Sequence, residues 1–279
     1  MEVISEEQTQ RLLAGVVIPP RPTVVSDIMA EHRRDVPDLR RVAGLISADV
    51  ALAAAILKTV NSTLYGLRRQ ISAIDQAVGM LGMNTVATLV TGLALRTAVP
   101  AQGLDRFWDG AARTALVSGY IAKHLGCVAP ADAHLFGLFR DCGIPLLLQR
   151  FGDYKETLRL ANAESERAFT DVEDDRYATN HAVVGSLLAA NWSLSEDLRT
   201  AIRVHHELDV FQSDHTPNVM NLVAVGILAE HIENAHSRLS SECEWTKLGE
   251  AALKHLMMRE EDMDELASDA LAMLEEAGQ

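Results

Sequence analysis

Apolar residues recur along the chain at spacings of three and four residues, which places them on one face of an α-helix. In the segment after Asp49, for example, Leu52, Ile56 and Val60 form such a stripe, and aspartate is a favourable residue at a helix N-terminus. No alternation of apolar and polar residues is long enough to predict a strand. The pattern therefore predicts an all-α fold.

The first hundred residues are predicted to form five or six short helices with brief connections. Their starts are marked by residues that favour a helix N-terminus: Ser5 with Gln8, Pro37, Asp49, Ser72 and Asn84. Gly82 is expected to end the helix that Ser72 begins. The segment 18–22 contains three prolines and is expected to be an extended connector.

The remaining sequence is also predicted to be helical. The expected helices are 107–125, 131–151, 154–165, 180–191, 196–206, 218–236, 244–258 and 262–277. We expect two packed multi-helix lobes, residues 1–100 and residues 101–215, followed by a C-terminal helical extension of residues 216–279. The last two helices carry apolar stripes, so we expect the extension to pack on the second lobe.

Composition and charge narrow the function classes. Hydrophobic residues make up 48% of the 279 residues and aromatic residues only 5%, as expected for a helical globular protein. The net charge of −14 argues against a general nucleic-acid binder, because phosphate contacts need a basic face. Residues 18–100 carry +3, however, so a nucleic-acid-binding regulator that uses the first lobe stays an alternative.

The cysteines and the hydropathy predict a cytoplasmic protein. Cys127, Cys142 and Cys243 are widely spaced, and the absence of a C-x-x-C pair excludes a zinc ribbon or a redox motif. The acidic N-terminus is unlike a signal peptide. The longest nearly uncharged apolar stretch, 86–95, is far shorter than the ~20 residues of a membrane span. We therefore expect no membrane contact.

The histidines are the first candidates for chemistry. His181 stands at the start of a predicted helix, and the adjacent His205 and His206 stand at the end of another. Imidazole and carboxylate ligands suit zinc, iron or manganese. Both sets also have structural interpretations, because a histidine near a helix C-terminus is favoured by the helix dipole and His181 can be a hydrogen-bonded core residue.

Several segments, taken together and in order, resemble the HDOD family, whose name stands for HD-related output domain. They are segments 18–22, 57–66 and 71–82, the Phe107-Trp108 pair, and the stretch 181–206. The resemblance covers about residues 18–209. It implies a bacterial, all-helical signalling protein related to the HD-type metal phosphohydrolases.

The sequence departs from active HD-type enzymes at three positions. Those enzymes carry a histidine shortly after the Phe-Trp pair, where this chain has Gly110. They carry a His-Asp pair, where this chain has Arg140 and Asp141, and many carry a lysine where it has Ile144. The family's remaining positions are matched by four residues, with Asp209 as a further candidate: Asp141, His181, His205 and His206.

These departures imply that catalysis has been lost. A guanidinium at position 140 cannot deprotonate or ligate a metal, and it would repel a dication. Arg140 is expected to pair with Asp141 or with a neighbouring carboxylate instead. Without a metal ion, no acidified water is available to attack phosphorus. We therefore predict no enzyme activity and no cofactor, and the four matched residues are vestigial metal candidates for which residual divalent metal binding is left open.

Five residues are candidates for contact with a partner or for lining a pocket: Asn61, Tyr65, Arg68, Arg69 and Arg140. Asn61 and Tyr65 belong to a polar turn between two predicted helices, and a capped turn is the structural alternative. Arg68 and Arg69 follow that turn and could contact an acidic partner, whereas ordinary surface charge is the alternative.

The leading functional interpretation is a non-enzymatic signal-transduction or scaffold module that acts through protein–protein interaction. The resemblance implies partners in cyclic-dinucleotide or two-component circuits, and a homo-oligomer is left open. The first alternative is a metal-dependent HD-type phosphohydrolase that acts on a nucleotide or cyclic dinucleotide with an atypical ligand set. Stoichiometric metal, together with turnover that Asp141→Ala abolishes, would favour that alternative.

Overall fold

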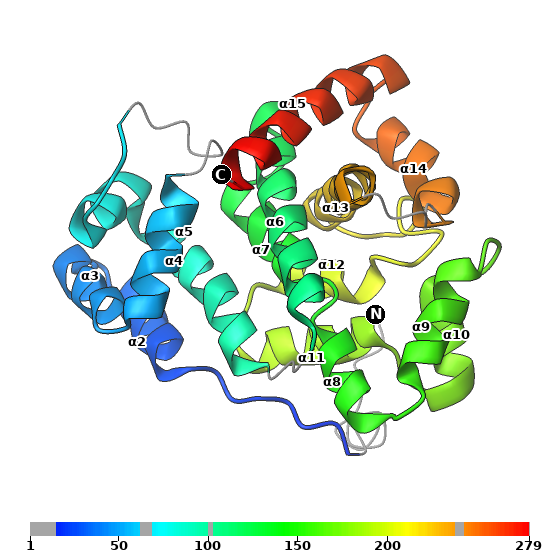
Figure 1. Cartoon of the computed structure of the whole chain (residues 1–279), viewed down its shortest axis with the longest axis horizontal. Coiled ribbons are helices and arrows are strands. Elements are labelled where there is room, and N and C mark those ends of the chain that lie inside the picture. The colour runs from blue at the N-terminus through cyan, green and yellow to red at the C-terminus, as the bar shows by residue number, and fades with distance from the viewer. Residues whose placement is uncertain (1–14, 62–68, 100–102, 238–242, 279) are drawn as a thin grey trace.

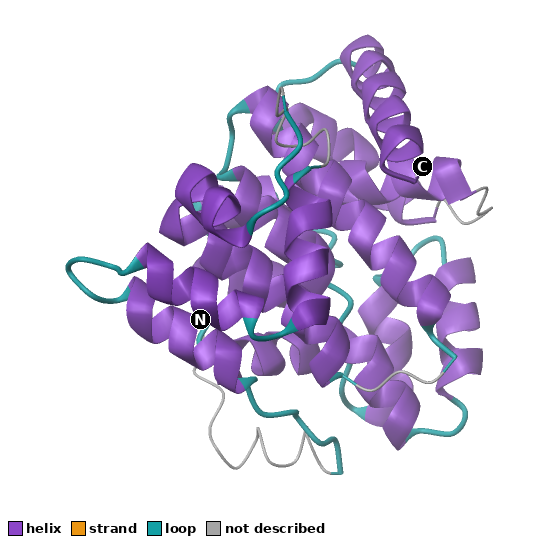
Figure 2. Ribbon diagram, turned by 60° about the vertical axis from the view of Figure 1, so that its left-hand side comes forward, coloured by secondary structure: helices purple, strands orange, loops and turns teal. Residues whose placement is uncertain are grey.

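The computed structural model describes residues 15–61, 69–99, 103–237 and 243–278. Within these ranges every regular element is a helix (Figure 2). The predicted all-α fold is therefore confirmed. The capping box expected at Ser5 and Gln8 lies outside the described residues.

The first lobe contains four described helices that pack together (Figure 1). They are α2 (Thr23–His32), α3 (Leu39–Ser47), α4 (Val50–Val60) and α5 (Ile74–Ala98). Asp38 and Asp49 cap α3 and α4 by accepting hydrogen bonds from backbone N–H groups of the first turn. Gly82 has a φ of +74°, which favours glycine, and the predicted break at this residue is present as a kink inside α5.

The proline-rich connector before α2 joins the first lobe to α11 (His181–Asn191). The Pro19 carbonyl accepts a hydrogen bond from Trp192 Nε1 at 3.1 Å. Arg21 Nη1 donates to the Trp192 carbonyl, also at 3.1 Å. Trp192 is fully buried at the end of α11, so the connector is held against the second lobe.

The second lobe is built around α6 (Asp105–Leu125) and α7 (Pro130–Phe139). These helices approach closely, because a Cβ added to Gly137 would lie 2.6 Å from the Cα of Ala115. Four further helices complete the lobe beside α11: α8 (Gly143–Arg150), α9 (Tyr154–Ala163), α10 (Phe169–Tyr177) and α12 (Glu196–Val204).

Two sequence predictions in this lobe need correction. The helix expected over 131–151 is wrong, because the chain turns at residues 140–142 and forms α7 and α8. Pro145 lies in the first turn of α8, where its missing N–H costs no helical hydrogen bond. Helix α10 was not predicted, because its acidic sequence shows no apolar stripe.

The C-terminal extension contains α13 (Pro217–Ser237), α14 (Cys243–His255) and α15 (Glu260–Gly278). Helix α13 packs against α6 and α12, α14 packs on α13, and α15 lies across α6 and α13 (Figure 1). Leu248 of α14 and Leu266 of α15 are buried in these contacts. The lobe boundaries at residues 100 and 215 stay predictions.

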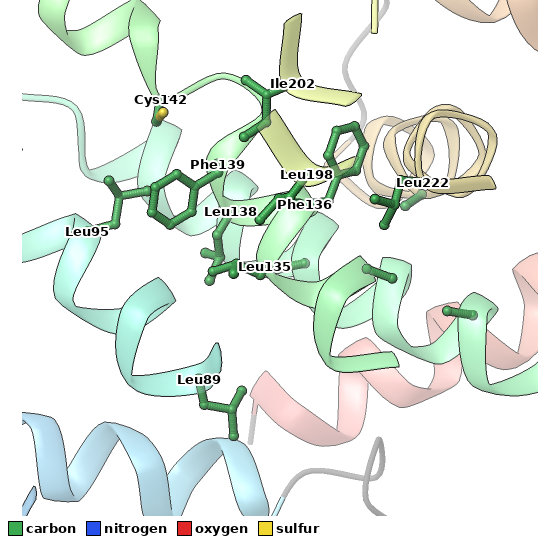
Figure 3. Packing of buried hydrophobic residues seen from close by; sticks show 14 of the residues in the cluster. Leu89, Leu95, Leu135, Phe136, Leu138, Phe139, Cys142, Leu198, Ile202 and Leu222 are labelled. Carbon is green, nitrogen blue, oxygen red and sulfur yellow. The ribbon is translucent and has the colours of Figure 1, made fainter. Parts of the chain in front are cut away.

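Helix α7 lies at the centre of the core. Figure 3 shows Phe139 near Leu95 of α5, and Phe136 on the side of Leu222 of α13. Phe136 packs on Gly226 of α13, where an added Cβ would lie 2.4 Å from its ring. Apolar contacts therefore hold α7 of the second lobe against α5 of the first, and the C-terminal end of α7 places Arg140 and Asp141 at the candidate site.

Membrane-span criteria are met weakly. Among the described residues, α5 alone is long and apolar enough to cross a membrane, and the bent α3–α4 pair qualifies only when taken as one span. Half of the apolar window of α5 is buried inside the fold, and core helices of globular proteins meet the same criteria.

Candidate functional site

Four residues that the sequence analysis singled out gather in one cluster. Asp141, His181, His205 and His206 each offer a ligand atom, and these atoms all lie within 4.8 Å of one another. The three histidines are buried, and the side chain of Asp141 is 27% exposed. The fold therefore brings together residues that are up to 65 positions apart in the sequence.

The cluster is positioned by the ends of α7, α8, α11 and α12. Asp141 lies in the turn between α7 and α8, and His181 begins α11. His205 is the C-cap of α12. The start of α8 touches the start of α11 so closely that a Cβ on Gly143 would lie 2.1 Å from the His181 carbonyl oxygen. Glycine at this position thus permits Asp141 to approach His181.

Three donor atoms of the cluster form a nearly equilateral triangle. Asp141 Oδ1 lies 3.4 Å from His181 Nε2 and 3.4 Å from His205 Nε2, and the two nitrogens are also 3.4 Å apart. The centre of a tetrahedron with an edge of this length lies about 2.1 Å from each corner, which is the usual length of Zn–N and Zn–O bonds. These three donors therefore fit one face of the coordination shell of a four-coordinate transition-metal ion, and the His206 donor lies within 4.8 Å of each of them.

Each histidine is oriented by a partner at Nδ1. His181 Nδ1 lies 2.7 Å from Glu173 Oε2, and His206 Nδ1 lies 2.6 Å from Glu244 Oε2. His205 Nδ1 donates to the Ile202 carbonyl at 2.7 Å. Metal-binding histidines usually have such outer partners, which fix the ring and leave Nε2 for the ion.

The neighbouring groups set the charges within the cluster. Burial alone would lower the pKa of His181, but Glu173 and Asp141 raise it to about 10. Burial lowers the pKa of His205 to about 3. Burial would raise the pKa of Asp141, but the adjacent guanidinium and the hydrogen bond from His181 hold it well below its usual range. Without an ion, His181 thus holds a proton at Nε2, which a bound metal ion would have to displace.

Arg140 occupies the other side of Asp141. Its Nε donates to Asp141 Oδ2 at 2.9 Å, its Nη2 to Glu230 Oε2 at 2.8 Å, and its Nη1 to the Gly226 carbonyl at 3.2 Å. Burial would lower the pKa of Arg140, but Asp141 and Glu230 raise it. The expected pairing of Arg140 with neighbouring carboxylates is therefore confirmed. The position beside Asp141 Oδ2 is filled by a guanidinium and does not fit a second metal ion.

A cleft of about 520 Å³ leads to Arg140 and Asp141. Gly110 lies in its wall, where an added Cβ would be 3.7 Å from Glu233 Oε1. That carboxylate accepts hydrogen bonds from the Nε and Nη2 of Arg113 at 2.9 and 2.6 Å. An ion pair between α6 and α13 therefore stands beside Gly110.

The remaining sequence candidates do not join this cluster. Asn61 Nδ2 donates to the Ile71 carbonyl, and Asn61 Oδ1 accepts from the Ile71 N–H, each at 2.7 Å. The side chain therefore links the end of α4 to the residues just before α5. Asp209 and Arg69 are exposed and lie outside the cluster. Tyr65 and Arg68 fall outside the described residues.

Three carboxylates around the site were missed by the sequence analysis: Glu173, Glu230 and Glu244. Each belongs to a stretch whose pattern at most indicated a helix. Glu173 is fully buried, and it also accepts a hydrogen bond from Tyr154. No local sequence signal marks these residues, because their partners are brought to them by the fold.

The helical fold and the buried His–Asp cluster have the features that the resemblance to the HDOD family implied. The family model of the HDOD domain matches residues 18–208, which is more than half of the chain. The chain therefore belongs to the HDOD family, a signal-transduction-like family, and the resemblance found in the sequence is confirmed.

The sequence identity to individual proteins is low. An uncharacterized protein of Treponema pallidum (strain Nichols) is 27% identical over 222 residues, which cover 76% of this chain and 43% of that protein. This chain thus spans less than half the length of that curated relative.

Two crystal structures are similar in fold. One, a "Putative phosphohydrolase" from Shewanella amazonensis SB2B, has a TM-score of 0.71, with 23% identity and 94% of each chain covered. The other, an HDOD domain protein with unknown function from Geobacter sulfurreducens, has a TM-score of 0.63, with 21% identity and coverage of 96% of this chain and 99% of that one. At these identities the similarity shows the fold alone.

Proposed function

We propose that this chain is a signal-transduction module that acts by binding partners and does not hydrolyse phosphoesters. The observation that carries the proposal is the buried guanidinium of Arg140 beside Asp141. A second metal ion there would have to displace a cation that is already paired with Asp141 and Glu230, and breaking a buried ion pair is costly. A two-metal hydrolytic centre is thus disfavoured by the chain's own charge.

The proposal includes one metal ion, in contrast to the expectation of no cofactor drawn from the sequence. Its ligands would be Asp141, His181 and His205, whose donor atoms are 3.4 Å apart, and His206, whose donor atom lies within 4.8 Å of the other three. Bound there, a divalent transition metal would supply positive charge and coordinate bonds. The chain's residues would hold the ion between the α7–α8 turn, α11 and α12, and would thereby fix the relative positions of these helices.

The partners that we propose are proteins of cyclic-dinucleotide or two-component circuits. Membership of the HDOD family, a signal-transduction-like family, supports this class of partner. The acidic surface indicated by a net charge of −14 favours a protein partner over a nucleic acid.

Hydrolysis assays on the full chain test the proposal. Protein without an affinity tag would be loaded with Zn²⁺, Mn²⁺ or, without oxygen, Fe²⁺, and then given bis(p-nitrophenyl) phosphate or a cyclic dinucleotide. We expect the wild type to turn over no faster than Asp141→Ala, which removes a ligand, and no faster than Asp214→Ala, which changes an exposed aspartate. Metal-dependent turnover that Asp141→Ala abolishes and Asp214→Ala preserves would contradict the proposal.

A single-metal phosphohydrolase is the second candidate function. It is favoured by the cleft of about 520 Å³, which gives a small substrate access to Asp141 and Arg140. In such an enzyme the Arg140 guanidinium would bind a phosphate oxygen of the substrate, in the place of a second metal ion. The same hydrolysis assays distinguish the two functions.

A further inference from the structure

One partner in the candidate site comes from beyond the family core. The HDOD match ends at residue 208, whereas Glu244 is the second residue of α14 in the C-terminal extension. Its side chain is only 14% exposed. The extension therefore covers the second lobe and also places a carboxylate against the cluster.

Glu244 is tied to the cluster through His206. Its Oε2 lies 2.6 Å from His206 Nδ1, which leaves Nε2 as the nitrogen that can bind an ion. The ring of His206 is further held by stacking on Phe169, with centroids 4.9 Å apart and an interplanar angle of 14°. Phe169 limits the tilt of the ring, and Glu244 determines which nitrogen carries the proton.

The same turn of α14 contacts the segment that carries the other outer carboxylate. Lys247, one turn after Glu244, forms an ion pair with it and donates from Nζ to the Arg167 carbonyl at 3.2 Å. Arg167 lies just before α10, which positions Glu173 against His181. Trp245 anchors this turn by stacking on His231 of α13, with ring centroids 4.0 Å apart. The docked position of α14 and the orientation of His206 are therefore one connected arrangement.

We propose that metal binding at the four-residue cluster and docking of α14 on the second lobe are coupled through Glu244. The inference rests on the metal-holding part of the proposed function. A carboxylate at Nδ1 strengthens the donor at Nε2 and stabilises the positive charge that an ion brings. Linkage is reciprocal, so an ion that binds more tightly when α14 is docked stabilises the docked helix by the same factor.

Because of this coupling, the arrangement of the C-terminal helices would depend on whether the cluster holds an ion. Helix α14 packs on α13, and α15 continues from it across α6, where Tyr120 donates to Asp269 at 3.3 Å. An ion in the cluster would thus favour one arrangement of the outer surface formed by α14 and α15. Glu244 is a positioning residue in this scheme, because it acts on the ion only through His206.

The test uses Co²⁺ as the probe on the full chain without an affinity tag. Co²⁺ affinity would be measured by titration of the visible absorption bands, for the wild type, for Glu244→Gln and for the control Glu250→Gln, an exposed change on the same helix. We expect Glu244→Gln to weaken Co²⁺ binding 10–100-fold, as is typical for loss of an outer partner, and Glu250→Gln to change it less than about 3-fold. Circular dichroism would check that each variant is folded.

Amide hydrogen exchange supplies the reciprocal measurement, which needs no variant. Adding Co²⁺ to the wild type should slow exchange in α14, and the effect should be reduced in Glu244→Gln but retained in Glu250→Gln. Equal Co²⁺ affinities for all three proteins, or unchanged exchange in α14 of the Co²⁺-loaded wild type, would overturn the coupling while leaving the metal site intact. Failure of the wild type to bind Co²⁺ would instead contradict the metal-holding part of the proposed function, and the coupling with it.

Discussion

At the scale of single residues, the site depends on which groups pair with the buried guanidinium of Arg140. Asp141 offers one oxygen to the histidines and the other to Arg140, whose guanidinium also reaches Glu230. A planar guanidinium can serve two carboxylates and a carbonyl at once, which a histidine at the same position could not do. Arg140 therefore pairs two carboxylates within the fold, and its charge at this position would oppose a second metal ion.

Removing this cation should destabilise the protein. In Arg140→Leu, Asp141 and Glu230 lose their shared partner while they stay largely enclosed, and the Gly226 carbonyl loses a donor. We expect the free energy of unfolding to fall by about 3 kcal/mol, the lower end of the cost of breaking a buried ion pair, since both carboxylates keep some contact with water. Urea denaturation measures this change.

The exposed Arg69 supplies the matched control. Arg69→Leu should alter the free energy of unfolding by no more than ~0.5 kcal/mol. If Arg140→Leu proved equally mild, the ion-pair network would not be important for stability, and the argument against a second metal ion would lose its energetic basis.

The four residues of the cluster could be found from the sequence, whereas the carboxylates that contact the cluster and Arg140 could not. Asp141, His181, His205 and His206 were identified because their order and spacing match a known family. Glu244 lies 38 residues from His206, and Glu230 lies 90 residues from Arg140. Such pairs are made by the packing of α13 and α14, and the sequence around a glutamate gives no local sign of which partner the fold will bring to it.

At the scale of helices, the site depends on close contact between the starts of α8 and α11. The sequence predicts a continuous helix over 131–151, because apolar residues recur throughout it. The chain turns at residues 140–142 instead, which allows Gly143 to approach the His181 carbonyl. Periodicity alone did not show this turn, since the apolar stripe on both sides of it faces the same core.

A methyl group at Gly143 should disturb both stability and metal binding. Its Cβ would lie 2.1 Å from the His181 carbonyl oxygen, so α8 and α11 would have to separate. We expect Gly143→Ala to lower the free energy of unfolding by about 1–3 kcal/mol, the usual cost of overpacking, and to weaken Co²⁺ binding because Asp141 moves relative to His181. Thermal unfolding and Co²⁺ titration measure the two effects.

Gly79 provides the comparison for this substitution. It lies in α5, is exposed, and has no atom within 4 Å of an added Cβ. Gly79→Ala should therefore be neutral or stabilising by up to ~1 kcal/mol through helix propensity. A stable Gly143→Ala protein with unchanged Co²⁺ affinity would show that contact between α8 and α11 does not position the cluster.

At the scale of the whole molecule, the two lobes share one hydrophobic core. A continuous cluster of buried residues runs from Val25 in α2 to Leu274 in α15. Helix α5 of the first lobe meets α7 so closely that a Cβ on Gly92 would lie 2.5 Å from the Leu138 side chain. With the connector also bound to Trp192, neither lobe can unfold without exposing apolar surface of the other.

The lobes should therefore unfold together, and the three tryptophans make this measurable. Trp108, Trp192 and Trp245 all follow residue 100, so their fluorescence reports the second lobe, the extension and, through Trp192, the docked connector, whereas far-UV circular dichroism also includes α2 to α5. In a urea titration we expect the two signals to give one coincident transition, as in two-state unfolding. An earlier loss of helical signal without a change in fluorescence would show that the first lobe unfolds independently, and a signal received at one lobe would then have no rigid core through which to reach the cluster.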